Sequence, residues 1–322
     1  MRCIIYGVGA IGGTLAAKLA QSGASVAGIA RGAQLEALKQ NRILLRTPSG
    51  EFRTRFPVVA DPAELPLGPD DIVFLCMKSQ DTTAALQRLL AAGATTQPIV
   101  CAQNGVANER EALRFFPNIY AMMVVLPATF LVPGEVAAFG MPHAGLFDLG
   151  RYPAGSDSTA DAIVAAHTAA GFADFKTPTA MVSKYGKLLM NLGNVLDAAA
   201  GDAIAGSPLL EAARAEGQTV LRAAGIAFGA GGDDPRRKTL MSAQPIPDTP
   251  RIGSSSAQSL ARDTGSIETD YLNGEIVLLG RLHGVPAPVN TALCALGRRL
   301  VAERVKPGSL SVAEIEAFVA AR

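Results

Sequence analysis

The sequence predicts an α/β protein with a doubly wound parallel sheet in its first half and an all-helical second half. Three observations predict this fold. Short apolar runs such as Cys3–Tyr6 and Asp71–Met77 alternate with helix-like stretches, which is typical of strand–helix–strand units with parallel strands. A glycine cluster lies at the first strand–helix junction. Beyond Pro178 the pattern becomes almost entirely helical, so we expect two domains, residues 1–177 and 178–322.

Each element is predicted from its local composition. Continuous apolar runs predict buried strands, and stretches of helix-forming residues that end at glycine predict helices. The first half is expected to contain strands at 3–6, 25–30, 71–77, 98–102, 119–126 and 173–176, and helices near 11–22, 33–40, 80–92 and 157–170. Residues 43–46 and 52–59 are expected to pair antiparallel around the turn Pro48-Ser49-Gly50. The second half is expected to contain helices near 180–199, 207–228, 255–264, 267–283, 288–304 and 311–320, with loops at 229–235 and 245–250.

The composition excludes several classes of protein. Of the 322 residues, 49% are hydrophobic and 18% are charged, which supplies a large core and excludes a disordered chain or a small disulfide scaffold. Twenty-nine basic and 28 acidic residues leave a net charge of +1, so nothing points to a nucleic-acid partner. The four cysteines lie far apart, and with only three histidines they predict structural thiols and no metal site.

The chain is expected to be soluble and cytoplasmic, with no membrane partner. Its longest apolar run, Ile119–Val132, contains Pro127 and is shorter than the roughly 20 residues of a membrane-spanning helix. Glycines at positions 7, 9, 12 and 13 interrupt the apolar N-terminal stretch, which argues against a signal peptide. Cysteines without paired spacing fit a reducing compartment.

The strongest local signal is the glycine cluster, which directly follows the first strand and opens the first helix. In such a cluster the first glycine permits a tight turn, the second lets the backbone approach a pyrophosphate, and the third permits close packing of helix on strand. The N-terminus of the helix adds N–H groups and the positive end of its dipole. The cluster therefore predicts a Rossmann-type dinucleotide site formed by Gly7, Val8, Gly9, Ala10, Ile11 and Gly12.

The end of the second strand indicates which dinucleotide binds. NAD sites usually carry Asp or Glu there, to accept a hydrogen bond from the ribose 2′-OH. This chain has Ala30-Arg31-Gly32 instead. The guanidinium of Arg31 can hold a 2′-phosphate through a charge-assisted fork. The sequence therefore predicts NADP (NADPH) as the cofactor, with a solvated surface arginine as the alternative.

Polar residues follow two further strands of the first half. Lys78 comes directly after the strand at 71–77, and Gln103-Asn104-Gly105 follows the strand at 98–102. Open α/β sheets bind ligands at the carboxyl ends of their strands, so both segments are candidates for cofactor binding. A lysine at a strand end and an Asn-Gly turn are the ordinary alternatives.

Lysine and asparagine recur on one face of the first helix of the second half. Lys184, Lys187, Asn191 and Asn194 are spaced by three, four and three residues, which places all four on the same side of a continuous helix. Such residues are costly on a buried face unless they are paired. From the spacing alone, a face turned toward a ligand and a face turned toward solvent are both open.

Taken together, these motifs resemble the ketopantoate reductases (2-dehydropantoate 2-reductases), NADPH-dependent enzymes of pantothenate biosynthesis. The resemblance covers most of the chain, from residue 4 to about 290, and the matching motifs occur in the family's order. They are Gly7–Gly12, Ala30-Arg31-Gly32, Met77-Lys78-Ser79, Gln103-Asn104-Gly105-Val106, Lys187-Leu188-Leu189-Met190-Asn191 and Glu268-Thr269-Asp270-Tyr271-Leu272-Asn273-Gly274.

The resemblance implies a role for individual residues. Lys187 is expected to be the general acid that protonates the carbonyl oxygen of a small 2-keto acid as hydride arrives, with Glu268 as the active-site carboxylate. Lys78, Asn104 and Ala128 are expected to contact the cofactor. The expected substrate-binding residues are Asn191, Asn194 and Ser255, with Ser256 as the alternative to Ser255.

The second half departs from the family pattern in two places. Family members carry a second asparagine eight residues after the lysine, where this chain has Val195, so Asn194 is expected to fill that role. A further family asparagine falls on Ile204 or Ala205. These departures leave reduction of a different 2-keto acid as an alternative, and a non-catalytic NADP-binding sensor as a second one. The oligomeric state is also open, with a homodimer through the helical half as one alternative.

Overall fold

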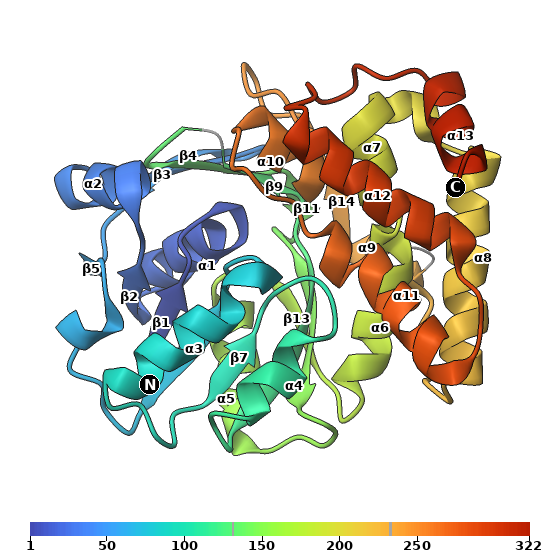
Figure 1. Ribbon diagram of the computed structural model, residues 1–322. Helices are drawn as coiled ribbons and strands as arrows, with labels where there is room; N and C mark the ends of the chain where they lie inside the picture. Colours follow the sequence, from blue (N-terminus) through green and yellow to red (C-terminus); the bar gives the residue numbers. More distant parts are fainter. Residues whose placement is uncertain (131, 232–233) are drawn as a thin grey trace. The chain divides into compact units, whose positions relative to one another are not determined.

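A computed structural model describes residues 1–130, 132–231 and 234–322 (Figure 1). The chain forms two compact units. The first consists of residues 1–181 and 233–251, and the second of residues 182–232 and 252–322. Each unit is described in turn below.

The first unit is built on an eight-stranded sheet. Its strands are β1 (Arg2–Tyr6), β2 (Ser25–Ile29), β5 (Val58–Val59), β6 (Asp71–Leu75), β7 (Ile99–Cys101), β8 (Ile119–Val125), β12 (Leu146–Arg151) and β13 (Ala173–Lys176). They lie in the order β13-β12-β8-β7-β6-β1-β2-β5. From β5 to β8 every pair is parallel. Numbered along the chain, these six strands have the order 3-2-1-4-5-6 of a dinucleotide-binding sheet, which confirms the predicted doubly wound fold.

Helices cover both faces of this sheet. The helices of the unit are α1 (Ala10–Gln21), α2 (Gly32–Gln40), α3 (Thr82–Ala91), α4 (Asn108–Leu113), α5 (Ser158–Ala169) and α9 (Pro235–Leu240). Ile5 of β1 packs in one buried cluster with Leu15 of α1 and Ile163 of α5. The adjacent Ile4 packs in the opposite cluster with Leu86 of α3. This alternation explains why the strands are apolar throughout, since both of their faces are buried.

Two small sheets add to the first unit and were not foreseen in full. One has the order β4-β3-β10-β9 and the other pairs β11 with β14. Their strands are β3 (Ile43–Thr47), β4 (Gly50–Thr54), β9 (Ala128–Thr129), β10 (Glu135–Ala138), β11 (Gly140–Pro142) and β14 (Met241–Ala243). The predicted antiparallel pair at 43–46 and 52–59 is confirmed for β3 and β4. Its second strand ends before Pro57, however, and β5 joins the large sheet beside β2.

The chain returns to the first unit after residue 232, which differs from the predicted division at residues 177 and 178. Residues 233–251 belong to the first unit because β14 pairs with β11 and Arg236 is anchored there. Arg236 Nη1 and Nη2 donate to Asp148 Oδ1 and Oδ2 of β12 at 2.8 and 2.9 Å. Its guanidinium also donates to Asp234 Oδ2 at 2.6 Å and lies 4.9 Å from the Phe175 ring. These hydrogen bonds raise the pKa of Arg236.

Replacing Arg236 with methionine is expected to destabilise the first unit. The buried carboxylate of Asp148 would lose its charged partner. Because the Arg236 side chain is 35% exposed, we expect a loss of roughly 3 kcal/mol, at the low end for a broken buried pair. Urea unfolding followed by circular dichroism measures this change. The control is Lys238→Met, in an exposed position of the same helix, which should cost less than about 0.5 kcal/mol. Equal losses for the two variants would contradict the anchoring role.

The described residues of the second unit form α-helices and short 3-10 turns, which confirms the predicted helical region. The helices are α6 (Ala180–Asn191, whose first two residues belong to the first unit), α7 (Asn194–Ala200), α8 (Pro208–Ala223), α10 (Ser255–Ala261), α11 (Asn273–His283), α12 (Pro288–Ala302) and α13 (Val312–Ala320). Serine caps support several of them. The Ser207 hydroxyl accepts from Leu210 N at the start of α8, and Ser311 forms a capping box with Glu314 at the start of α13.

The single helix predicted at 180–199 is wrong, because the structure has two helices separated at Leu192 and Gly193. Glycine is a poor helix former, and here it also permits a close approach of α8. A Cβ at Gly193 would lie 2.7 Å from Leu210 Cδ1.

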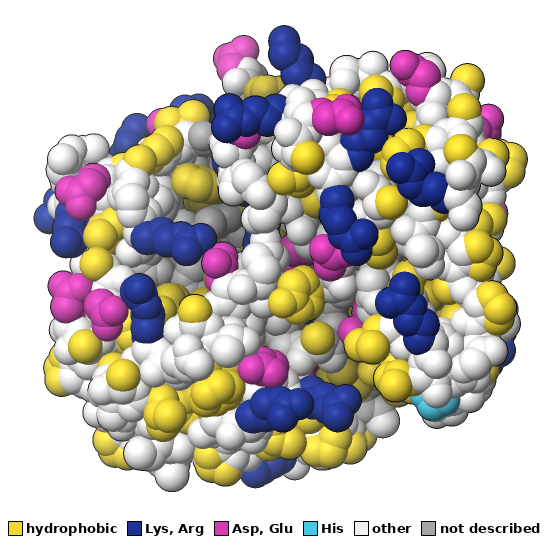
Figure 2. All heavy atoms as spheres, in the orientation of Figure 1, with side chains coloured by type: hydrophobic (Ala, Val, Ile, Leu, Met, Phe, Trp, Pro, Cys, Tyr) yellow, Lys and Arg dark blue, Asp and Glu magenta, His cyan; other side chains and the backbone are white. Residues whose placement is uncertain are grey.

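Charge is mixed on the visible surface. Figure 2 shows Lys and Arg side chains interspersed with Asp and Glu on the face that it presents. In the described part of the chain, no helix is long and apolar enough to cross a membrane.

Candidate active site

The glycine cluster forms a tight turn between β1 and α1. Gly7 has a φ of +98°, and a Cβ on it would lie 2.8 Å from Met77 N in the loop after β6. A Cβ on Gly12 would lie 2.1 Å from Gly7 O. Both positions therefore require glycine for the fold itself. The turn lies between β1 and β6, where strand order reverses and where open α/β sheets bind ligands.

Gly9 differs from these two glycines, because no protein atom crowds it. Its φ is −95° and its ψ is −148°, and a Cβ there would meet no atom within 4 Å. Gly9 is the N-cap residue of α1, and no described side chain caps this helix. The first N–H groups of a helix need partners from outside it. The space beside Gly9 and the start of α1 thus fits an anionic group such as a pyrophosphate.

A buried glutamine that the sequence did not single out holds this turn. Gln34 of α2 donates from Nε2 to Val8 O at 2.8 Å, and its Oε1 accepts from Gly134 N at 2.6 Å. It thereby links the glycine cluster to the start of β10. No local pattern could have identified Gln34, because Gly134 lies 100 residues further along the chain.

Arg31 lies at the carboxyl end of β2, as the N-cap residue of α2. Its side chain is 85% exposed, and Nη2 lies 3.1 Å from Asp81 Oδ2. Asp81 ends the 3-10 turn η2 (Ser79–Asp81) after β6. Asp81 lies three residues after Lys78 and belongs to none of the motifs recognised in the sequence.

A network of buried amides and hydroxyls joins the loops that carry Lys78 and Asn104. Asn108 Nδ2 donates to Asn104 O at 2.9 Å and to Ser79 Oγ at 3.2 Å. Gln103 Nε2 donates to Met77 O at 3.1 Å. Thr82 Oγ1 accepts from Gln103 Nε2 and donates to Asn108 Oδ1. The network brings the loops after β6 and β7 together at the same edge of the sheet as the glycine cluster.

Ala128, the remaining cofactor candidate, lies in the four-stranded small sheet. It is buried in β9 and pairs with Ala138 of β10.

The lysine and asparagine face of α6 does not turn toward solvent as a whole. Lys184 is buried at 3% exposure, Asn191 is buried at 8%, and Lys187 is half-buried. The solvent-facing alternative is therefore wrong for Lys184 and Asn191. Asn191 Nδ2 is buried and has no hydrogen-bond partner among the described residues.

Asn194 begins α7, on the far side of the break after α6. The expectation that it points near the direction of Lys187 assumed a continuous helix, so that geometric reason does not hold. Asn194 O accepts from Ser254 Oγ at 3.0 Å, which ties the start of α7 to the start of α10. Val195, at the position of the family asparagine, is 1% exposed and packs in the core.

Ser255 and Glu268 complete the predicted residues of the second unit. Ser255 is the first residue of α10, directly after its N-cap Ser254. Its Oγ is buried and without a hydrogen-bond partner in the described chain, like Asn191 Nδ2. Glu268 is buried directly before the 3-10 turn η5 (Thr269–Tyr271).

Three of the four cysteines do not supply nucleophiles. Burial raises the pKa of the Cys76 thiol to about 12 and those of Cys3 and Cys294 to about 11. Thiols of this kind are inert because the thiolate is the reactive form. Within residues 1–130, 132–231 and 234–322, no three His, Cys, Asp or Glu side chains gather as a metal site.

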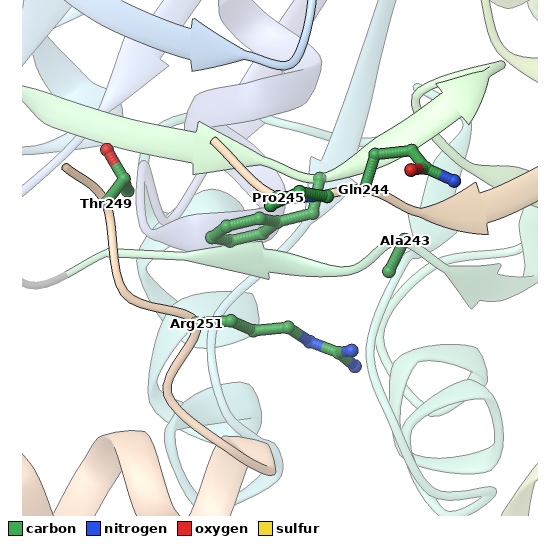
Figure 3. Close-up of a pocket in the computed structure, with 6 residues that line it drawn as sticks. Ala243, Gln244, Pro245, Thr249 and Arg251 are labelled. Carbon is green, nitrogen blue, oxygen red and sulfur yellow. The ribbon is translucent and has the colours of Figure 1, made fainter. Parts of the chain in front are cut away.

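A separate pocket of about 280 Å³ opens in the first unit (Figure 3). Its lining residues come from the segment after β10 and from the segment around β14, and Figure 3 shows the Arg251 side chain extending from the loop that follows β14. The residues that line the pocket are Phe139, Ala243, Gln244, Pro245, Thr249 and Arg251. None of the residues predicted from the sequence to bind cofactor or substrate lines this pocket.

Comparison with known families matches both units. A model described as ketopantoate reductase PanE/ApbA matches residues 3–153, and one described as its C-terminal part matches residues 181–300. A 2-dehydropantoate 2-reductase of Mesorhizobium japonicum is 31% identical over 94% of this chain and 99% of its own length. One from Halobacterium salinarum is 26% identical over 92% of this chain and 98% of its own length.

Solved structures share the fold. A PanE/ApbA family ketopantoate reductase from Ralstonia eutropha has a TM-score of 0.77 at 27% identity, covering 94% of this chain and 99% of that one. A D-mandelate dehydrogenase, solved with NADH and anilino(oxo)acetate, has a TM-score of 0.78 at 22% identity with the same coverage.

Proposed function

The chain belongs to the ketopantoate reductase family, and on that premise we propose that it reduces 2-dehydropantoate to (R)-pantoate with NADPH, as a step of pantothenate biosynthesis. The observation that carries the proposal lies in the second unit. Asn191 Nδ2 and Ser255 Oγ are buried polar atoms without hydrogen-bond partners among the described residues, at two positions where the family binds substrate. Buried polar groups are normally paired, so these two fit a polar ligand.

The first unit fits the cofactor. The space beside Gly9 suits a pyrophosphate at the start of α1, and Arg31 offers a fork to a 2′-phosphate. Lys78, Asn104 and Ala128 are the further residues that would hold NADPH. When bound, NADPH supplies the hydride.

In the reaction, the protein itself donates a proton and orients the substrate. The Lys187 ammonium donates a proton to the carbonyl oxygen of the 2-keto acid and stabilises the negative charge that develops there. Glu268 is the carboxylate of the site. Asn191, Asn194 and Ser255 bind the hydroxyl and carboxylate groups of the substrate and thereby orient it.

A different 2-keto acid is the second candidate substrate. The family carries asparagines where this chain has Val195 and either Ile204 or Ala205, which changes the substrate-binding set. Val195 is buried in the core. The D-mandelate dehydrogenase shares the fold, and that fold is therefore compatible with more than one 2-oxo or 2-hydroxy acid.

Steady-state kinetics with a panel of substrates tests the proposal. The purified protein is assayed with 2-dehydropantoate, 2-ketoisovalerate, phenylglyoxylate and pyruvate, each with NADPH and with NADH. We expect the highest kcat/KM for 2-dehydropantoate with NADPH. A higher kcat/KM for another acid would favour the second candidate. Dinucleotide binding without turnover of any acid would indicate a binding protein.

A further inference from the structure

Asp81 provides a carboxylate at the place where Arg31 is expected to bind the 2′-phosphate. Arg31 Nη2 and Asp81 Oδ2 are 3.1 Å apart, although the residues are 50 positions apart in the chain. The Asp81 side chain is 37% exposed, so its carboxylate is accessible to a ligand. Dinucleotide sites that prefer NAD carry an acidic residue at the end of the second strand, which this chain lacks. Asp81, in the loop after β6, places an acidic side chain beside the end of β2 instead.

The loop that carries Asp81 borders the glycine cluster. A Cβ on Gly7 would lie 2.8 Å from Met77 N, four residues before Asp81. In the sheet, β1 lies between β2 and β6. The ends of β1, β2 and β6 therefore meet where these two charges lie.

The carboxylate of Asp81 contributes little to the stability of the fold. It is the N-cap residue of α3, yet its side chain makes no capping hydrogen bond. Its one partner among the described residues is Arg31, and exposed ion pairs of this kind stabilise a fold little. The carboxylate is thus available to a ligand whenever Arg31 swings away.

We propose that Asp81 is a specificity-determining residue that accepts a hydrogen bond from the ribose 2′-OH of NADH and disfavours the 2′-phosphate of NADPH. The inference rests on the proposed dinucleotide site. A carboxylate and a phosphate are both acceptors with negative charge, so they repel each other and share no proton. The ribose hydroxyl is a donor and pairs with Asp81 directly. The chain therefore discriminates less between the two dinucleotides than Arg31 alone would.

Asp81→Asn tests this role, because it removes the charge and keeps the shape. Dissociation constants for NADPH and NADH are measured by the fluorescence of the reduced nicotinamide, without substrate. We expect the ratio of Kd for NADH to Kd for NADPH to rise by about three- to tenfold, the size of one charge interaction exposed to water. The matched control is Asp61→Asn, which removes the partner of Arg88 nearby and should leave the ratio unchanged.

An unchanged ratio in Asp81→Asn, or a shift toward NADH, would overturn the inference. If the unmodified protein binds neither dinucleotide, the proposed function fails and the inference fails with it. Arg31→Ala separates the two roles at this site, since it should weaken NADPH far more than NADH. Adding Asp81→Asn to Arg31→Ala should still weaken NADH. If it has no effect there, Asp81 acts only by holding Arg31, and direct recognition of the ribose is wrong.

Discussion

Replacing Lys187 with methionine is expected to lower kcat by about 10²- to 10⁴-fold, the usual contribution of a positioned general acid. The ammonium of Lys187 gives its proton to the carbonyl oxygen and offsets the charge that develops on it. Methionine keeps the apolar stem of the side chain and removes only the charged end. The dissociation constant for NADPH should change less than twofold, because the residues proposed to hold the cofactor lie in the other unit.

Lys184 is the matched control, one helical turn earlier on α6. It is buried at 3% exposure, so Lys184→Met is expected to act on stability more than on the chemical step. Thermal unfolding and single-turnover hydride transfer, measured on both variants, separate these effects. If Lys184→Met slows hydride transfer while Lys187→Met transfers hydride at the normal rate, the assignment of the general acid is wrong.

The central sheet could be predicted because its signals are local. β1 and β6 are apolar on both faces, and each residue of Ile4-Ile5 packs into a different buried cluster. A continuous apolar run of this kind reports burial directly. β11 and β14 are each three residues long and exist only through partners distant in the chain, such as Met141 with Ser242. Their short sequences carry no pattern of their own.

The helix break at Gly193 was missed for a related reason. The spacing of Lys187, Asn191 and Asn194 fits one helix, and a single glycine costs only about 1 kcal/mol in a helix interior. Leu210 of α8 lies close to Gly193, as Leu189 lies close to Gly217 in the uninterrupted helix α8. Neither the glycine nor its spacing in the sequence shows that α6 ends at Asn191.

The candidate site could be predicted where its residues form a recognisable sequence motif. The spacing of Gly7, Gly9 and Gly12 identifies the motif in the sequence. In the structure, a Cβ would be crowded at Gly7 and Gly12, whereas the space beside Gly9 is open. Gln34 and Asp81 were missed because a glutamine in a helix and an aspartate after a strand are ordinary residues. Only the fold shows that Gln34 holds the Val8 carbonyl and that Asp81 meets Arg31.

Gly9→Ala and Gly12→Ala are also expected to have large effects, but on different properties. Gly9→Ala should weaken NADPH binding, and Gly12→Ala should lower thermal stability. A Cβ on Gly9 meets no protein atom within 4 Å and enters the space proposed for the pyrophosphate. We expect the dissociation constant for NADPH to rise by about ten- to hundredfold, which corresponds to the usual cost of overpacking. Tm should fall by about 3 °C, because alanine is a poorer N-cap residue than glycine and the change costs about 1 kcal/mol.

Gly12→Ala should lower Tm even without a ligand, since its Cβ would lie 2.1 Å from Gly7 O and 2.9 Å from Cys76 Cβ. The backbone of the turn cannot yield as a flexible side chain would, so we expect a fall of about 5–10 °C. Differential scanning calorimetry of the two variants, with and without NADPH, measures both effects. Addition of NADPH should raise Tm for the unmodified protein and leave Gly9→Ala nearly unchanged. If Gly9→Ala binds NADPH normally, the pyrophosphate does not lie against Gly9, and the glycine cluster serves only to pack α1 on the sheet.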